Sequence, residues 1–368
     1  MKRREFITLI GATASAWPLA ARAQQPGQSR RVALLVAEAN DDDPEYERRI
    51  SALVAALRDL DWIDGRNLRL LIHRVKPIAA DLRNGVAELL AENPEVIVSG
   101  GGTTTPPLLQ ATNRIPIVFT TAVDPVGSGL VESLAHPGGN VTGFMQFDYS
   151  LSGKWLELLK QVSPATVRVG VVRDATIPSG IGQFAVIQSV AGSFGVDVIP
   201  IGTRDANEIE SGLAKIAQSP NGGLVVTLGA AVGGHRGLIV SSAVRYRLPA
   251  VYANRAFVDH GGLISYGSDL ISSVRRAASY VDRILKGEKP ADLPVQAPNK
   301  YEIVVNLKAA KAIALDLPAT LIGRADEVIE ESADSRTWHE PDQPRRCAEV
   351  RYEHHSRRPP IQIYGLTP

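Results

Sequence analysis

The sequence predicts an α/β protein of two lobes, each built around a doubly wound, mostly parallel sheet. From residue 31 onward, short apolar runs alternate with longer amphipathic stretches, which is the pattern of strand–helix–strand units in parallel sheets. The same alternation restarts after Gly143 and continues over a stretch of similar length. Two such lobes place a cleft at the carboxyl ends of both sets of strands, where open α/β sheets bind their ligands.

The elements of the first lobe follow from its apolar runs, taken in chain order. Strands are expected at 32–36, 68–72, 95–99 and 117–119, and helices at 44–60, 78–90 and from about 103. Asp43 is expected to cap the first helix, which Pro44 begins, because a side-chain oxygen at that position accepts from the unpaired N–H groups of the first turn.

The second lobe repeats the pattern and is followed by a return segment. Strands are expected at 167–172, 196–201, 224–228 and 250–252, and helices at 151–162, 180–194, 206–217 and 232–246. A long amphipathic helix over 270–285 comes next, with Asp269 as its possible N-cap and Gly287 as its stop. Residues 289–294 are expected to form a rigid extended linker, and 301–306 a further strand.

Composition is that of a soluble globular chain with no strong charge bias. The 368 residues are enough for two cores, and 44% hydrophobic with 21% charged residues is ordinary. Without residues 1–23, which carry four basic side chains and one acidic side chain, the formal net charge changes from +1 to −2. Such a chain lacks the basic surface that binds nucleic acid or anionic membranes, so neither is expected as a partner.

The first 23 residues have the pattern of a bacterial export signal. Arg3 and Arg4 stand before Phe6 and a modestly apolar run, and Ala21-Arg22-Ala23 is a small-x-small cleavage site. The paired arginines fit the twin-arginine subtype. Because the run is too short and too interrupted to span a bilayer, we expect cleavage near Ala23 and a periplasmic protein without stable membrane insertion. An ordinary N-terminal amphipathic helix is the alternative.

The two ends of the chain differ in character from the middle. Cys347 is the sole cysteine, so no internal disulfide is possible, and no cysteine follows the cleavage site to carry a lipid anchor. Residues 331–368 contain five prolines and clustered histidines and arginines, without a sustained apolar period. They are expected to form a disordered tail unrelated to the fold, and the sequence assigns it no function.

No catalytic constellation is found in the sequence. The histidines before the tail are scattered, and none has metal-ligand spacing to another histidine or a carboxylate. A Gly-x-Ser-x-Gly nucleophile motif is also missing. The acidic run 41–43 is better explained by the helix cap at Asp43 than by a cation site. We therefore predict no catalytic residue, no metal and no cofactor.

The segment Gly100-Gly101-Gly102-Thr103-Thr104-Thr105 follows an expected strand and opens an expected helix. Unpaired N–H groups at such a point favour an anion, the glycines admit a ligand to the backbone, and the hydroxyls add donors. The segment is neither a Walker loop nor a complete Gly-x-Gly-x-x-Gly motif. It therefore favours a carboxylate over a nucleotide, with a tight turn capped by threonine as the structural alternative.

Polar and aromatic residues stand at other strand ends that would face the same cleft. These segments are 120–124, 173–174, 228–230, 252–254 and 265–269. Each one singly is more often structural than ligand-binding, and Asp269 serves equally as a helix cap. Together they offer hydroxyls, a carboxylate and aromatic faces for an amino acid or a similar zwitterion. The candidate rings for stacking on a ligand ring are those of Phe144, Phe147, Tyr252 and Tyr266, and the alternative for each is a place in the core.

Several long motifs occur in one order along residues 31–330. They are Ile115-Pro-Ile-Val-Phe119, Asp124-Pro-Val-Gly127, His136-Pro-Gly-Gly-Asn-Val-Thr-Gly143, Gly261-Gly-Leu-Ile-Ser-Tyr-Gly267, Ala277-Ala-Ser-Tyr-Val-Asp-Arg-Ile-Leu-Lys-Gly287, Pro290-Ala-Asp-Leu-Pro-Val295, Asn306-Leu-Lys-Ala-Ala-Lys311 and Arg324-Ala-Asp-Glu-Val-Ile-Glu330. On these motifs the chain resembles the periplasmic substrate-binding proteins of ATP-binding-cassette (ABC) transporters, in the family whose named members carry tryptophan or tyrosine. The tail beyond residue 330 departs from the family pattern.

The resemblance implies a type 1 periplasmic-binding fold, in which three hinge crossovers join two lobes that close on the ligand. Carried onto this chain, the crossovers fall near 143–150, 266–270 and 295–301. The implied domains are a first lobe of residues 30–145 plus 270–295 and a second lobe of residues 146–269 plus 296–330.

The resemblance also implies a function and a set of ligand-binding residues. Receptors of this kind hold an amino-acid carboxylate on hydroxyls and backbone N–H groups of the first lobe. Matched by position, the ligand-binding residues are Gly102, Thr103, Thr104, Thr121 and Ala122 in the first lobe and Tyr252, Asn254 and Asp269 in the second. The implied protein is a monomeric receptor that delivers an amino acid or similar carboxylate to an ABC permease by cleft closure. The named members of the family imply an aromatic amino acid as the solute.

Two other functions remain open at the level of the sequence. A ligand-sensing module for a membrane signalling partner would use the same closing lobes, so the sequence does not separate sensing from transport. A periplasmic enzyme is the third possibility, and no cofactor motif supports it. The identity of the solute and a strict dependence on twin-arginine export are also left open.

Overall fold

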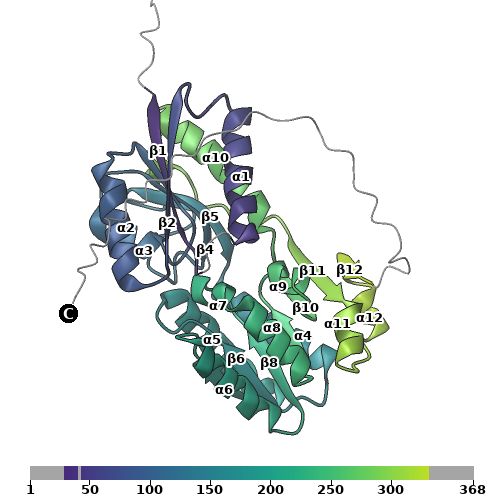
Figure 1. Cartoon of the computed structure of the whole chain (residues 1–368). Coiled ribbons are helices and arrows are strands. Elements are labelled where there is room, and N and C mark those ends of the chain that lie inside the picture. Colours follow the sequence, from purple (N-terminus) through teal and green to yellow (C-terminus); the bar gives the residue numbers. More distant parts are fainter. Residues whose placement is uncertain (1–28, 40–42, 331–368) are drawn as a thin grey trace, which may run out of the picture. The chain divides into compact units, whose positions relative to one another are not determined.

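The computed structural model describes residues 29–39 and 43–330, which contain two separate sheets flanked by helices (Figure 1). The expected signal peptide, the expected tail with Cys347, and the acidic residues 41 and 42 lie outside the described residues. The predicted fold class, two α/β lobes with mostly parallel sheets, is confirmed.

The first sheet has five parallel strands in the order β2-β1-β3-β4-β5. Their bounds are β1 Arg30–Ala37, β2 Leu68–Val75, β3 Val96–Ser99, β4 Ile117–Val123 and β5 Val141–Phe147. Strands β3, β4 and β5 are buried along their whole lengths, as a sheet covered on both faces requires. The covering helices are α1 Pro44–Asp59, α2 Ala79–Ala91, α3 Thr105–Ala111 and the returning α10 Leu270–Leu285.

The second sheet has seven strands in the order β12-β11-β10-β9-β8-β6-β7. The strands are β6 Arg168–Val172, β7 Asp197–Ile201, β8 Gly222–Val226, β9 Ala250–Tyr252, β10 Ile264–Ser268, β11 Tyr301–Asn306 and β12 Glu327–Ile329. Only the β10–β11 pair is antiparallel. The helices of this lobe are α4 Ser152–Val162, α5 Pro178–Ala191, α6 Ala206–Ala217, α7 Ala230–Gly234, α8 Arg236–Arg245, α9 Arg255–Asp259, α11 Leu307–Ala312 and α12 Ala319–Ile322.

The chain passes between the two sheets three times: after β5, after β10 and before β11. Helix α10 returns to the first sheet because its apolar face, including Val274, Ala277 and Val281, packs with α1 in one core cluster. The next segment stays with that sheet, since Leu293 is fully buried and its carbonyl accepts from the Thr142 hydroxyl at 2.5 Å. The expected extended linker over 289–294 therefore contains a 3₁₀ turn, Pro290–Asp292, packed against β5.

Other differences from the expected elements have local causes. Strand β4 runs on to Val123, so Thr121 and Ala122 lie within the strand and do not follow it. The expected helix 232–246 is two helices that meet at His235. The fifth strand, β5, was not expected, and its Gly143 is needed because a side chain there would collide with the Phe119 backbone of the neighbouring strand.

Candidate functional site

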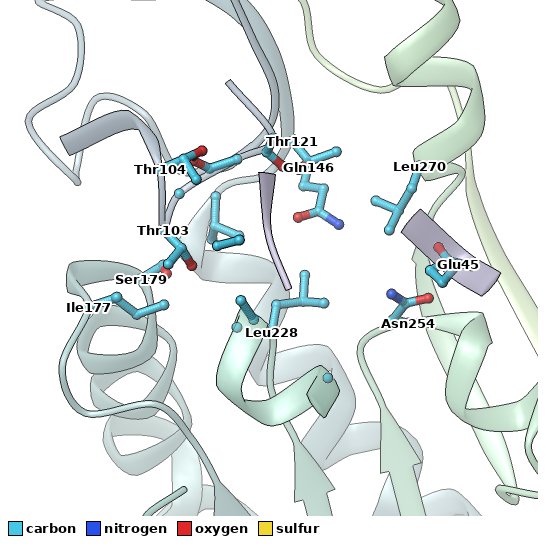
Figure 2. A pocket seen from close by; sticks show the side chains of 18 of the residues that line it. Glu45, Thr103, Thr104, Thr121, Gln146, Ile177, Ser179, Leu228, Asn254 and Leu270 are labelled. Atoms are coloured by element: carbon cyan, nitrogen blue, oxygen red, sulfur yellow. Dashed lines mark hydrogen bonds between the residues drawn. The ribbon is translucent and has the colours of Figure 1, made fainter. Parts of the chain in front are cut away.

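A pocket lies between the carboxyl ends of the two sheets and is lined by both lobes (Figure 2). The first lobe contributes the loop 100–104 after β3, the end of β4 and Gln146 near the end of β5. The second lobe contributes residues 177–179 after β6, 227–230 after β8 and Asn254 after β9. This is the edge at which parallel α/β sheets form ligand sites.

The loop 100–104 is held in shape by its own hydroxyl groups. Thr104 Oγ1 lies 2.6 Å from Ser99 Oγ, and the Thr105 hydroxyl donates to the Gly101 carbonyl at 2.8 Å. Gly101 has φ of +141°, and a Cβ there would stand 2.6 Å from Thr121 Oγ1, so only glycine fits. The fixed loop leaves Gly102 and Thr103 facing the pocket.

Two of the pocket threonines use their hydroxyl protons within the fold. The Thr121 hydroxyl donates to the Gly100 carbonyl at 2.8 Å and ties the end of β4 to the loop. Thr104 is 1% exposed and lies within hydrogen-bond distance of both Ser99 and Gly101. These groups shape the pocket wall, and their protons are not free for a ligand.

The two lobes approach each other at Thr103 and Ser179, which lie together on one side of the pocket (Figure 2). A Cβ built at Gly102 would lie 3.7 Å from Ser179 Oγ, in ordinary contact distance across the lobes. Ser179 belongs to the first turn of α5, where the N–H groups of Gly180 and Ile181 donate to the Ile177 carbonyl, and the Ser179 N–H has no recorded partner among the described residues. Among the described residues, neither the Thr103 nor the Ser179 hydroxyl has a recorded hydrogen bond.

The acidic side chain in the pocket wall is already neutralised. Glu45 accepts from Arg49 at 2.8 Å and from Arg48 at 2.7 Å. Burial would raise the pKa of the Glu45 carboxyl, but the adjacent Arg49 and Arg48 outweigh it and hold the pKa below its usual range. Glu45 is therefore a charged but fully engaged carboxylate at neutral pH.

A buried ion pair joins the two lobes beside the pocket. Arg236 of α8 donates to Asp43 Oδ2 at 2.9 Å, and the side chains are 9% and 8% exposed. The other Asp43 oxygen caps α1 by accepting from the Glu45 N–H at 3.0 Å, as expected from the sequence. Burial would raise the pKa of the Asp43 carboxyl, but the Glu45 N–H and Arg236 together lower it.

Five of the eight residues expected at the ligand line this pocket. They are Gly102, Thr103, Thr104, Thr121 and Asn254. Asn254 also caps α9, because its Oδ1 accepts from the Ala256 N–H at 2.9 Å. The structure thus brings the Gly-Thr loop and the end of β9 to one place.

The other three expected residues lie outside the pocket, for three different reasons. Ala122 is fully buried in the core of the first lobe, because successive side chains of β4 point to opposite faces. Tyr252 is 1% exposed and stacks on Phe257 with ring centroids 5.0 Å apart, and its burial raises the pKa of the phenol. Asp269 caps α10 by accepting from the N–H groups of Ile271 and Ser272.

The rings suggested for stacking also belong to the cores. Phe144 packs against Tyr280 with centroids 4.8 Å apart, and Phe147 meets Trp155 edge-on at 5.3 Å. The aromatic residues in the pocket wall are Tyr46 and Phe257 instead. Sequence reasoning missed these, together with Glu45, Gln146, Ser179 and Arg236.

Within residues 29–39 and 43–330, no helix combines the length and the apolar character needed to cross a membrane. In the same part of the chain, no group of three or more histidine, cysteine or acidic side chains is arranged to hold a metal ion.

Two α/β lobes around a pocket, linked by three crossing segments, define a binding protein of the type 1 periplasmic-binding class. A family model described as ABC transporter substrate binding protein matches residues 41–329, and the chain belongs to this family. It is thus a solute-binding protein of the ABC-transporter type.

Individual relatives agree with this assignment. A protein named tyrosine-binding protein from Clostridioides difficile (strain R20291) is 24% identical over 278 residues, covering 74% of this chain and 78% of the relative. A solved conserved domain protein from Vibrio cholerae is 25% identical with a TM-score of 0.76, covering 82% of this chain and 100% of that one. The ABC domain in complex with L-Trp from Streptococcus pneumoniae is 22% identical with a TM-score of 0.74, at the same coverages.

Proposed function

We propose that the protein is a periplasmic receptor that binds an aromatic amino acid between its lobes and delivers it to an ABC permease. The observation that carries the proposal is the pocket itself, which presents uncommitted polar groups of both lobes on either side of one space. The names of two relatives, a tyrosine-binding protein and a domain in complex with L-Trp, support the class of solute.

The carboxylate of the solute is assigned to the side of the pocket formed by Thr103 and Ser179. Their hydroxyls are available as donors, and Gly102 leaves the backbone of the loop accessible. The first turn of α5 adds the Ser179 N–H, which has no recorded partner, and the positive end of the helix dipole. A carboxylate there would touch both lobes at once and so favour the closed arrangement over an open one.

The charges of the site favour a solute without net charge. Glu45 is paired with Arg49 and Arg48, Arg48 also lies 4.0 Å from Asp259, and Asp43 is paired with Arg236, so each of these charged side chains has a partner of opposite charge. A zwitterion fits such a site, whereas a solute with an additional charge would bring a charge that no group compensates.

The remaining wall is apolar and suits a large side chain. It is formed by Tyr46, Ile177, Leu228, Phe257 and Leu270. Aromatic rings gain most from burial in a wall of this kind, and offset or edge contacts with Tyr46 and Phe257 would add to it.

Delivery, location and domain organisation complete the proposal. Residues 1–23 direct export, by the twin-arginine route, and the mature receptor is a periplasmic monomer. The lobes, 30–145 plus 270–295 and 146–269 plus 296–330, close on the solute, and the closed form docks on the permease. Loss of uptake of the labelled amino acid in cells lacking the gene would distinguish transport from sensing.

Calorimetric titration of the purified protein tests the solute class. We expect L-tryptophan or L-tyrosine to bind and L-glutamate to fail. Thr103→Ala and Ser179→Ala should each weaken binding by roughly tenfold, because each removes one donor to a charged carboxylate. Ser189→Ala, at the exposed far end of α5, is the matched control and should leave the affinity unchanged. Failure of every aromatic amino acid to bind would refute the proposal, and unchanged affinity in both variants would remove this pair from the site.

A further inference from the structure

We propose that Gln146 is the specificity-determining residue of the pocket, and that it holds the ammonium group of the solute by accepting its N–H through Oε1. The inference rests on the proposed function and extends it to a residue that neither motif nor family resemblance indicated. It assigns to this amide the discrimination between an amino acid and the corresponding acid without an amino group.

The first observation is a buried amide without a partner. Gln146 is 5% exposed and lines the pocket, yet no hydrogen bond of its side chain is recorded within the described residues. The polar atoms of the Gln146 amide are not among the enclosed unpaired atoms of the described residues, so they remain accessible from the pocket and open to a ligand. Figure 2 shows the Gln146 amide directed into the pocket, between the pair Thr103 and Ser179 and the pair Glu45 and Asn254.

The fold itself gives no reason for a polar residue at this position. Gln146 lies in β5, whose seven residues are all buried, and its neighbours Met145 and Phe147 belong to two apolar cores. The strand is held by backbone pairing with β4 and not by this side chain. A hydrophobic residue would serve the strand equally well, so the amide is explained by what enters the pocket.

The second observation is that the acidic groups near the pocket are saturated. Both Glu45 oxygens accept from arginines, and both Asp43 oxygens accept from Arg236 or the Glu45 N–H. The Asn254 oxygen is engaged in capping α9. An ammonium group needs acceptors, and the Gln146 oxygen is an amide acceptor in the wall with no competing donor.

Geometry and charge agree with this assignment. In an α-amino acid, the ammonium and carboxylate groups are attached to the same carbon, so the ammonium acceptor must stand beside the carboxylate site. Figure 2 shows the Gln146 amide entering the same pocket, between Thr103 and Ser179 on one side and Glu45 and Asn254 on the other. A neutral amide accepts the hydrogen bond without adding a second acidic group beside Glu45, and so keeps the site electrically balanced.

The test measures the affinities of two pairs of ligands for the wild-type protein and for Gln146→Met. L-tyrosine is titrated against 3-(4-hydroxyphenyl)propionate, and L-tryptophan against 3-(indol-3-yl)propionate; within each pair the acid lacks only the ammonium group. The wild-type protein should prefer the amino acid by roughly tenfold or more. Gln146→Met keeps the length of the side chain and removes its polar atoms. This variant should bind the amino acid more weakly by that factor, and its affinity for the acid should change by less than about threefold. The preference for the amino acid then disappears.

Two further variants make the outcome decisive. Gln146→Glu replaces the amide with a carboxylate, which has two acceptor oxygens, a negative charge and no donor, so it should retain binding of the amino acid and reject the acid. Gln161→Met, on helix α4 and outside the pocket lining, is the control for the exchange itself and should bind as wild type. Melting temperatures of all variants verify that they fold.

The inference is overturned if Gln146→Met lowers the affinity for both ligands of a pair equally, or leaves both affinities unchanged. It is also overturned if Gln146→Glu abolishes binding of the amino acid. Equal weakening would mean that the amide contacts the carboxylate or the ring. If the wild-type protein binds none of the four ligands, the proposed function fails and this inference fails with it. A wild-type protein that binds amino acids while Gln146→Met keeps its preference refutes the inference alone.

Discussion

At the scale of single residues, what matters in the pocket is whether a polar atom already has a partner. Thr104 and Thr121 face the site, but their hydroxyl protons are engaged with Ser99 or with backbone carbonyls of the same loop. Ser179 and Gln146 are equally buried and have no recorded partner. Because the polar atoms of Ser179 and Gln146 remain accessible from the pocket, they mark where a ligand can form a hydrogen bond, whereas Thr104 and Thr121 mark where the wall is built.

Gly101 provides a prediction about the wall. Gly101→Ala would place a methyl group 2.6 Å from Thr121 Oγ1 at a φ of +141°, a conformation that alanine rarely adopts. We expect a loss of about 1–3 kcal/mol in the free energy of unfolding, measured by urea denaturation, together with weakened ligand binding. Gly237→Ala is the control, since that glycine lies in helix α8 with open space around it. The free energy of unfolding of this variant should equal or exceed that of the wild type. Equal stability of the two variants would contradict the assigned strain.

The pocket residues that sequence reasoning located are those set by local backbone chemistry. The Gly-Thr loop after an apolar run was recognisable, and it brought Gly102, Thr103 and Thr104 to the pocket. Gln146 was missed because its strand was not expected, and Ser179 because its approach to Gly102 is a contact between lobes. Contacts between distant segments leave no local pattern, so three-dimensional information was needed for them.

At the scale of elements, the helix α10 shows how a cap differs from a ligand residue. Asp269 accepts from two N–H groups of its first turn, at 2.9 and 3.1 Å, and is exposed. Asp269→Ala should therefore lower the free energy of unfolding by about 1 kcal/mol and leave ligand affinity unchanged. Asp269→Asn keeps a capping oxygen and should retain most of the stability. A loss of affinity in Asp269→Ala with unchanged stability would return this residue to the binding site.

Elements with strong periodicity and clear ends were predicted closely. Helices α6 and α10 and strands β9 and β11 have the expected bounds. The helix α10 combines an aspartate cap with a glycine at φ +106° just beyond its end, so its signals agree. The short elements α9, α12 and β12 were not expected; strand β9 is equally short, but it was recognisable from its position in the strand–helix alternation.

At the scale of the whole molecule, the pair Asp43 and Arg236 couples the two lobes. The pair joins the start of α1 in the first lobe to α8 in the second, and a side chain at Gly234 would collide with Ala39 across the same seam. Both charged groups lose water when the lobes meet. Their mutual attraction therefore supports the closed arrangement only while both are charged and in place.

Arg236→Met should consequently weaken ligand binding by at least about tenfold, because closure would then bury the Asp43 carboxylate without its partner. Asp43→Asn keeps an oxygen that can cap α1 and removes the charge. The double variant Asp43→Asn with Arg236→Met should thus bind more tightly than Arg236→Met, since no charge is left unpaired. Calorimetric titration measures these affinities, and a double variant weaker than Arg236→Met would exclude this electrostatic account.

The same pair predicts a dependence on pH with a defined sign. The pKa of Asp43 is lowered in the structure, so its carboxylate contributes fully at pH values above its usual pKa, and the contribution is lost as pH falls through the lowered value. Wild type should therefore exceed Arg236→Met in affinity at neutral pH, and the ratio of their affinities should fall toward one only at strongly acidic pH. As a control, the ratio of the affinities of wild type and Ser189→Ala is measured over the same pH range, and it should stay constant. A ratio that already falls between pH 7 and pH 6 would contradict the assignment of this pH dependence to Asp43.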